Sequence, residues 1–444
     1  MKLFSIFLLS LVAFAQSDRG TISGTVSDPA GALIPNANVT VVNQATGVKL
    51  ALATTQTGNF SAPYLNAGLY EVTVEVQGFR KSVQKNVRVQ VAQSASLDIT
   101  LQIGSAAESI SVTAESPLLN TDSAASSTTI NREQLNQLPL NFAIGQGAIR
   151  NPLSFTQLTP GASINGWNNI KVNGAPAGTF KIIFEGQDST SSLDGRVSDE
   201  SQPSVEAVEE FTLQTSNYSA EFGQVGGGLF NFTSRSGTNQ YHSSVYDYFV
   251  NEAFNAGIPF TNNGKNGLVR PRARRNNFGG TFGGPLTIPK LYKGENKTFF
   301  FLNYEKYLNK EGKFDGYGTV PTDAYRNGDF SAALTGRNLG TDGLGRPILE
   351  NTIYDPRTSR AAADGRIYRD LFPGNIVPTS LLDPVALKIQ ALIPKASSAG
   401  LINNFERRYN FRKIQDIPSV KIDHNFTGST RVSLYYSSLL SKTI

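Results

Sequence analysis

The residues from Tyr241 onward alternate between polar and apolar or aromatic side chains, and this pattern constrains the fold more than any other feature. Each alternating segment has the length that a tilted strand needs to cross a bilayer, roughly ten residues. Unpaired backbone groups in lipid cost several kcal/mol each, so such strands must close into a barrel. Five segments fit before Ile444, too few for closure. We therefore expect the N-terminal part of a larger outer-membrane β-barrel protein.

The alternation also predicts which side chains face lipid. The expected strands are Tyr241–Asn251, Asn276–Pro285, Lys297–Asn309, Ser419–Phe426 and Thr430–Leu439. In the third of these, Phe300, Leu302 and Tyr304 fall on one side. Phe301, Asn303 and Glu305 fall on the other, so one face suits lipid and the other the lumen. The long segments Glu252–Arg275 and Lys310–Pro418 are expected to be extracellular loops.

The first 15 residues have the composition of a signal peptide. Lys2 precedes an apolar run, and Ala13-Phe14-Ala15 is a typical cleavage pattern before Gln16. The run is shorter than the roughly 20 apolar residues of a membrane-spanning helix. We expect residues 1–15 to be removed on export, on the way to the outer membrane of a Gram-negative-type bacterium.

The supply of reactive side chains is small. The chain has no cysteine, which excludes disulfides, thiolate metal sites and a lipoprotein anchor, and it has only two histidines, His242 and His424. Both fall in expected strands, so we interpret them as barrel-wall residues. We expect no catalytic site, metal site or cofactor, and hence no enzyme. A net charge of +5 is small for this length and gives no support to nucleic-acid binding.

Residues 20–103 are predicted to form a β-sandwich. The expected short strands, each bounded by Gly, Pro or Asn, are Thr21–Val26, Ala37–Val42, Val48–Ala53, Leu69–Val76, Val83–Val91 and Ser96–Leu101. The phrases Gly24–Asp28, Ile34–Val39, Thr57–Phe60 and Leu69–Val74 resemble those of carboxypeptidase regulatory-like domains, which are transthyretin-like sandwiches. The resemblance implies a binding or spacer role without catalysis.

Residues 104–122 are rich in Ser and Ala and are predicted to be a linker without a packed core. Within it, Glu108-Ser109-Ile110-Ser111-Val112-Thr113-Ala114 is a β-prone stretch that could add as a strand to the sheet edge of a partner. By itself the motif also fits a plain linker. It resembles the TonB box of energy-coupled outer-membrane receptors, which implies TonB as a periplasmic partner.

Residues 123–237 are predicted to form an α+β plug domain. Asn131 and Gln134 have the spacing of a capping box, with Ile130 and Leu135 as a hydrophobic staple, so a short helix should end near Pro139. Strands are expected at Phe180–Phe184, Phe211–Thr215 and Leu229–Arg235, with a helical stretch at Val205–Glu210. The Gly-rich run Asn217–Gly228 lacks the spacing of a nucleotide-binding loop, so we attribute its glycines to close backbone packing.

The Asn217–Gly228 run is similar to the plug of TonB-dependent receptors in the branch called Oar-like. Further phrases in residues 238–444 extend this resemblance: Tyr246–Ala256, Asn277–Pro285, Thr298–Glu305, Gly328–Ser331 and Phe372–Pro378. The family has barrels of about 22 strands. The resemblance therefore implies that these residues are the incomplete start of an Oar-like barrel, not competent for transport alone.

An arginine cluster lies at the expected outer end of the second strand: Arg270, Arg272, Arg274 and Arg275. Its guanidinium groups could bind lipopolysaccharide phosphates or another anion in bidentate fashion. Alternatively, the cluster is a solvated loop end that anchors the strand at the interface of the outer-membrane lipid.

Two functions remain open at this point. The first is energy-coupled uptake, in which an extracellular ligand shifts the plug and the segment Glu108–Ala114 becomes available to TonB. The second is a non-transporting surface protein, with the sandwich as a carbohydrate- or protein-binding module. The ligand itself could be a glycan, a peptide or a metal chelate.

Overall fold

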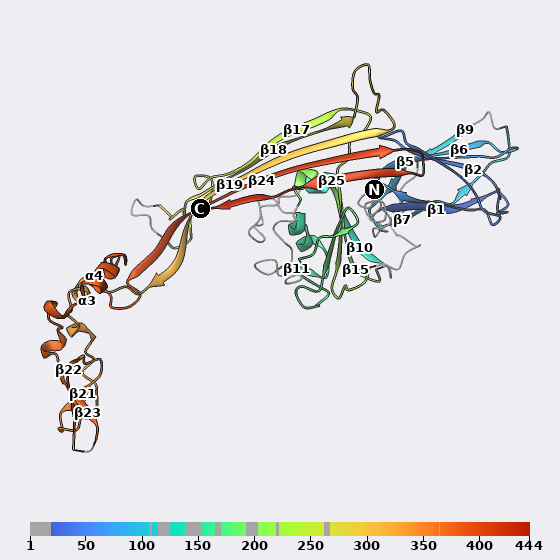
Figure 1. Ribbon diagram of the computed structural model, residues 1–444. Coiled ribbons are helices and arrows are strands. Elements are labelled where there is room, and N and C mark those ends of the chain that lie inside the picture. The colour runs from blue at the N-terminus through green and yellow to red at the C-terminus, as the bar shows by residue number, and fades with distance from the viewer. Residues whose placement is uncertain are drawn as a thin grey trace, which may run out of the picture. The chain divides into compact units, whose positions relative to one another are not determined.

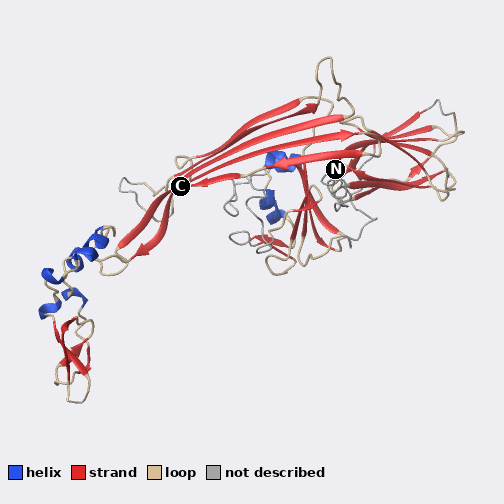
Figure 2. Ribbon diagram, viewed as in Figure 1, coloured by secondary structure: helices blue, strands red, loops and turns tan. Residues whose placement is uncertain are grey.

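The computed structural model is mainly β, with a few short helices (Figures 1 and 2). It describes residues 19–105, 109–113, 125–137, 152–164, 170–191, 203–218, 222–261, 267–363 and 365–444. The expected signal peptide, residues 1–15, and the expected mature start at Gln16 lie outside these ranges. No helix in the described part of the chain has the length and apolar character needed to cross a membrane.

The N-terminal residues form a sandwich of two sheets around an apolar core. One sheet has the order β4-β1-β7, with β8 also paired to β1, and the other has the order β3-β2-β5-β6-β9. The strands are β1 Gly20–Ser27, β2 Asn38–Asn43, β3 Lys49–Ala53, β4 Asn59–Leu65, β5 Gly68–Glu75, β6 Lys81–Val89, β7 Ser94–Ser96, β8 Ile99–Thr100 and β9 Ser109–Thr113. Alternate residues such as Ile22, Val72 and Val74 are completely buried, which is the period-2 pattern of half-buried strands.

The sandwich differs from the sequence prediction in three places. The predicted strand Ser96–Leu101 is replaced by two short strands, β7 and β8, which both pair with β1. Strand β4 was not predicted, since Pro63 and the turn-forming residues around it mask the alternation of Phe60 and Ala62 toward the core. Within residues 104–122, which the sequence predicts to be a linker, the structure describes Ser109–Thr113 as a strand. These residues pair in parallel with β6 and complete the edge of the second sheet.

The next described residues form a small α+β domain in the region that the sequence predicts to be a plug, and we call it the plug domain. Its main sheet has the order β10-β15-β16-β13-β14, and β11 pairs with β12. Its elements are β10 Ser126–Asn131, α2 Arg132–Gln137, η2 Pro152–Leu158, β11 Ala162–Ile164, β12 Ile170–Val172, β13 Lys181–Phe184, β14 Gln187–Asp188, η4 Val205–Ala207, β15 Val208–Ser216 and β16 Leu229–Ser234. Phe211 stacks on Phe232 with ring centroids 5.1 Å apart at the centre of its core.

The predicted capping box at the start of α2 is confirmed. The backbone N–H of Gln134 donates to Oδ1 of Asn131 at 3.0 Å, and the backbone N–H of Asn131 donates to Oε1 of Gln134 at 3.1 Å. The helix ends at Gln137, and Pro139 lies outside the described residues. The predicted helical stretch Val205–Glu210 is correct only for the single turn Val205–Ala207, because from Val208 the backbone is already extended in β15 and pairs with β16.

The C-terminal strands form one antiparallel sheet, which we call the barrel sheet. Its order is β17-β18-β19-β24-β25, and β26 also pairs with β24. The strands are β17 His242–Val250, β18 Ala273–Pro285, β19 Thr298–Gly318, β24 Phe405–Asn425, β25 Arg431–Ser437 and β26 Leu440–Thr443. β19 and β24 each have 21 residues, far longer than predicted. Both ends of the expected loop Lys310–Pro418 are therefore strand, at residues 310–318 and 405–418.

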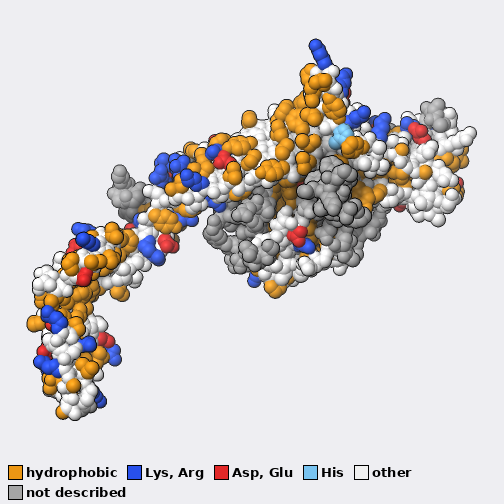
Figure 3. All heavy atoms as spheres, in the orientation of Figure 1, with side chains coloured by type: hydrophobic (Ala, Val, Ile, Leu, Met, Phe, Trp, Pro, Cys, Tyr) orange, Lys and Arg blue, Asp and Glu red, His pale blue; other side chains and the backbone are white. Residues whose placement is uncertain are grey.

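The predicted separation of the two faces of this sheet is confirmed. Asn303, Glu305 and Lys421 are each at most 4% exposed. Leu302 and Ile422, which alternate with them, are 44% and 38% exposed. Further apolar side chains of the outward face are Val245, Val432, Leu434 and Tyr436. Figure 3 shows hydrophobic side chains gathered along these strands, as the lipid-facing side of a membrane sheet requires.

Residues 311–411 form a second compact unit, which we call the loop unit. Between its long strand ends it contains α3 Asp323–Arg326, η5 Ser331–Ala333, β20 Asn338–Thr341, β21 Pro347–Leu349, β22 Tyr354–Ala361, β23 Ile367–Leu371, η6 Pro373–Asn375, η7 Thr379–Leu381 and α4 Pro384–Ala391. Asp383 caps α4 by accepting hydrogen bonds from the amides of Val385 and Ala386. The expected long loop is thus a folded unit rather than an open connection.

Candidate functional site

The strand that the sequence singled out, β9, lies at the edge of the second sandwich sheet. Its five residues pair in parallel with β6, from Ser109 opposite Lys81 to Thr113 opposite Lys85. Of the predicted segment, Glu108 and Ala114 lie outside the described residues. The structure therefore places the central five residues in strand addition, although the sheet that receives them belongs to the same chain.

The register of β9 sets which of its side chains face the sandwich core. Ile110 lies opposite Ser82, and Val112 lies opposite Gln84. Opposed residues share a face of a sheet, and Ser82 in turn opposes the fully buried Val74. Ile110 and Val112 therefore extend the inner face of the sheet, whereas Ser109 and Ser111 are exposed on the outer face.

The plug domain contacts the inner face of the barrel sheet through a buried ion pair. Nζ of Lys421, in β24, lies 2.9 and 2.8 Å from the two carboxylate oxygens of Glu185, in the turn after β13. Ser234 adds a backbone N–H bond of 2.6 Å to the same carboxylate. Burial alone raises the pKa of Glu185, but the Lys421 ammonium and these hydrogen bonds outweigh it and hold the pKa below its usual range.

A second buried carboxylate, Glu305 of β19, gathers donors from both the plug domain and the barrel sheet. It accepts hydrogen bonds from Oγ of Ser204 in the plug domain, from Tyr246 at 3.0 Å and from Nδ2 of Asn277 at 2.8 Å. Glu305 is only 1% exposed. Its position on the lumen side was predicted from the alternation, but its partners come from elements distant in sequence.

The sandwich also contacts the plug domain, through the segment 91–93 that follows β6. The amide of Val91 donates to the carboxyl group of Glu210 in β15, and Nε2 of Gln93 donates to Oγ1 of Thr129 at 2.8 Å. The pKa of Glu210 is raised to about 7, because the burial of its carboxyl group outweighs the lowering by the Val91 N–H, while the nearby Glu209 raises it and Arg88 lowers it by smaller amounts. Ala92, between these contacts, has a left-handed backbone with φ of 53°.

The arginine cluster is partly neutralised within the chain. Nη2 of Arg274 lies 2.8 Å from Oε1 of Glu252, and Nη1 of Arg270 donates to the carbonyl of Ala253 at 3.3 Å. Arg274 and Arg275 lie in β18, whereas Arg270 and Arg272 precede it. These contacts fix part of the cluster to the end of β17 rather than leaving four converging guanidinium groups for an anion.

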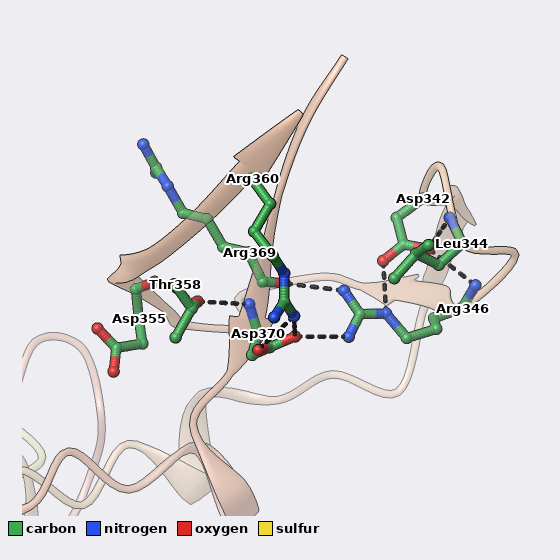
Figure 4. A network of polar contacts seen from close by, with 8 residues as sticks. All are labelled: Asp342, Leu344, Arg346, Asp355, Thr358, Arg360, Arg369 and Asp370. Carbon is green, nitrogen blue, oxygen red and sulfur yellow. Dashed lines mark hydrogen bonds and ion pairs between the residues drawn. The ribbon is translucent and has the colours of Figure 1, made fainter. Parts of the chain in front are cut away.

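The loop unit has its own charge network, which Figure 4 shows. Arg346 pairs with Asp342 at 2.7 Å and with Asp370 at 3.0 Å, and Arg360 also pairs with Asp370 at 2.7 Å. The amide of Asp370 donates to Oγ1 of Thr358 at 2.8 Å. The network joins the turn before β21 to the β22–β23 hairpin, so its charges hold the unit together and do not form an open binding site.

Within the described part of the chain, no group of three potential ligands could hold a metal ion. His242 Nδ1 lies 2.8 Å from the carbonyl of Gln240, and His424 Nδ1 lies 2.6 Å from Oγ1 of Thr298. Each histidine thus has a structural partner next to its strand.

Sequence reasoning missed Glu185, Lys421 and Glu210 as important residues. Lys421 is an inward-facing charge in an alternating strand, which is a usable signal because a buried charge requires a partner. The identity of that partner had no signal, since Glu185 lies 236 residues earlier.

Two family models match the chain. The outer membrane beta barrel domain matches residues 233–443, and the carboxypeptidase regulatory-like domain matches residues 21–102. The TonB-dependent transporter Oar of Myxococcus xanthus is 25% identical over an alignment of 341 residues, which covers 73% of this chain and 30% of that protein. The chain therefore spans less than a third of the length of this relative.

Similarities to solved structures are local. Catechol 1,2-dioxygenase from Acinetobacter sp. ADP1 is 12% identical, with 23% of this chain and 60% of that chain covered at a TM-score of 0.18. The minor pilin GBS52 of Streptococcus agalactiae is 16% identical, with 20% of this chain and 46% of that chain covered at a TM-score of 0.16. Scores this low carry no argument about fold or activity.

Proposed function

We propose that this outer-membrane protein, which joins a carboxypeptidase regulatory-like sandwich to strands of an outer-membrane barrel domain, is a TonB-dependent receptor for energy-coupled uptake. The observation that carries the proposal is the plug domain, whose Glu185 pairs with Lys421 on the inner face of the barrel sheet. A domain attached to the lumen side through a buried ion pair can block a passage and can also be released.

The arrangement suggests how force would act. An extracellular ligand shifts the plug domain, TonB takes up residues 108–114 by strand addition in the periplasm, and tension on this segment reaches the plug domain through the chain. The contacts that must break include the Lys421–Glu185 pair and the hydrogen bond from Ser204 to Glu305. No bond in the ligand is made or broken.

Binding of TonB to a peptide of residues 104–122 tests the proposal. A proline at Ile110 or Val112 removes a backbone donor and fixes φ, so it should weaken binding to the TonB C-terminal domain far more than Ser111→Ala does. Isothermal titration calorimetry with the three peptides measures the difference. No binding to any of them, or equal affinity for the proline and unmodified peptides, contradicts energy coupling through this segment and favours a passive surface protein.

A further inference from the structure

The register of β9 continues two rows of side chains that cross the whole sandwich sheet. One row consists of Leu52, Val39, Val74, Ser82 and Ile110, and the other of Leu50, Val41, Val72, Gln84 and Val112. A shift of one residue would turn Ile110 and Val112 to the solvent side and the serines to the core side. The amino-acid alternation of β9 therefore matches this site.

The packing of β9 is nevertheless weak. Val112 remains 45% exposed, and Ile110 is only partly buried. Both lie beside the polar residues Ser82 and Gln84 of β6 rather than beside apolar ones. Backbone hydrogen bonds, each worth about 1 kcal/mol net, must supply most of the attachment. A strand held in this way can leave without unfolding the sandwich, whose core cluster contains no β9 residue.

From this geometry we infer that the β6 edge is a resting site for residues 109–113, and that the sandwich competes with TonB for them. The inference rests on the proposed function. While β9 is paired, the backbone groups that point toward β6 are occupied, and Ile110 and Val112 lie on the inner face of the sandwich. Strand addition reads alternate side chains in pockets, so TonB needs the residues that the sandwich holds. The sandwich thus limits coupling until β9 is released.

A reversible disulfide tests the competition, and the absence of natural cysteines makes it specific. Val83→Cys with Ser111→Cys joins β6 to β9 at directly opposed positions. Thr40→Cys with Ala51→Cys is the matched control, because this pair lies in the same cross-strand row but at the far edge, between β2 and β3. Both variants are made in the full chain, in detergent, and their affinity for the TonB C-terminal domain is measured by biolayer interferometry with and without reductant.

We expect the Val83–Ser111 disulfide to form in the folded protein and to weaken TonB binding about tenfold or more, with recovery on reduction. The control disulfide should leave the affinity unchanged. Failure of the Val83–Ser111 pair to oxidise, or equal TonB affinity before and after reduction while the 104–122 peptide binds, overturns the competition alone. Failure of TonB to bind both the reduced protein and the free peptide overturns the proposed function, and the competition with it.

Discussion

Lys421 carries a charge that the inner face of β24 buries almost completely, with 2% of the residue exposed. Replacing one partner of such a pair leaves the other charge uncompensated, so Lys421→Met should lower the stability of the plug contact by about 3 kcal/mol or more. The loss is measured as the change in hydrogen exchange of residues 181–188 and 229–234, recorded by mass spectrometry at increasing urea concentrations.

The matched control for Lys421→Met is the double variant Glu185→Gln with Lys421→Met. It removes both charges, and uncharged replacements of a buried pair often change stability little. The stability of its plug contact should therefore return to within about 1 kcal/mol of that in the natural protein. A double variant as unstable as Lys421→Met would show that the ion pair is not what holds the plug domain to the sheet.

Glu210 makes the contact between the sandwich and the plug domain depend on pH. Its pKa is about 7 in the folded protein and near 4.5 when solvated, so the contact is strongest below pH 4.5 and weakens as the pH rises toward 7. The change is on the order of 3 kcal/mol. Exchange protection of the Val91 amide should fall accordingly, whereas Glu210→Gln should give a flat profile. Equal pH profiles for both proteins would contradict the burial argument.

At the scale of elements, the close approach of the glycine run to the plug core can be tested directly. A Cβ at Gly228 would lie 2.9 Å from Cγ2 of Val172 and 3.0 Å from Cδ1 of Leu213. Gly228→Ala should therefore destabilise the plug domain by about 1–3 kcal/mol through overpacking. Gly223→Ala is the control, since its Cβ meets nothing within 4 Å. Urea denaturation of the two variants, monitored through the hydrogen exchange of β16, measures the difference. Equal stability of the two variants would refute close packing at Gly228.

The elements that the sequence predicted well are those whose side-chain period is set by one local environment. The faces of β19 follow from alternation between lipid and lumen, and the capping box of α2 is complete within four residues. β9 was predicted as a strand-forming segment, but its partner β6 was not, because pairing depends on residues about 28 positions away. The same limit applies to Glu185 and Lys421, whose chemistry is visible in the sequence while their proximity is not.

At the scale of the whole molecule, the sandwich has a core of its own. All buried members of its cluster lie between Ile22 and Leu101, and none comes from the plug domain or the barrel sheet. Its contacts with the plug domain are made mainly by polar groups, among them Glu210, Gln93 and Thr129. Polar contacts of this kind are exchangeable with water at modest cost, so the sandwich does not need them in order to fold.

We therefore expect residues 19–105 to fold alone as a soluble, monomeric β-sandwich, and residues 19–115 to fold with β9 added. Far-ultraviolet circular dichroism should show β structure for both proteins, and cooperative unfolding should follow from the shared core. Amide protection at the β6 edge should be higher in the longer protein, because only that protein contains the strand that covers it. Disorder or dominant helix in residues 19–105 would mean that the sandwich depends on the plug domain after all. Equal protection of the β6 edge in the two proteins would mean that β9 needs more than the sandwich to remain paired.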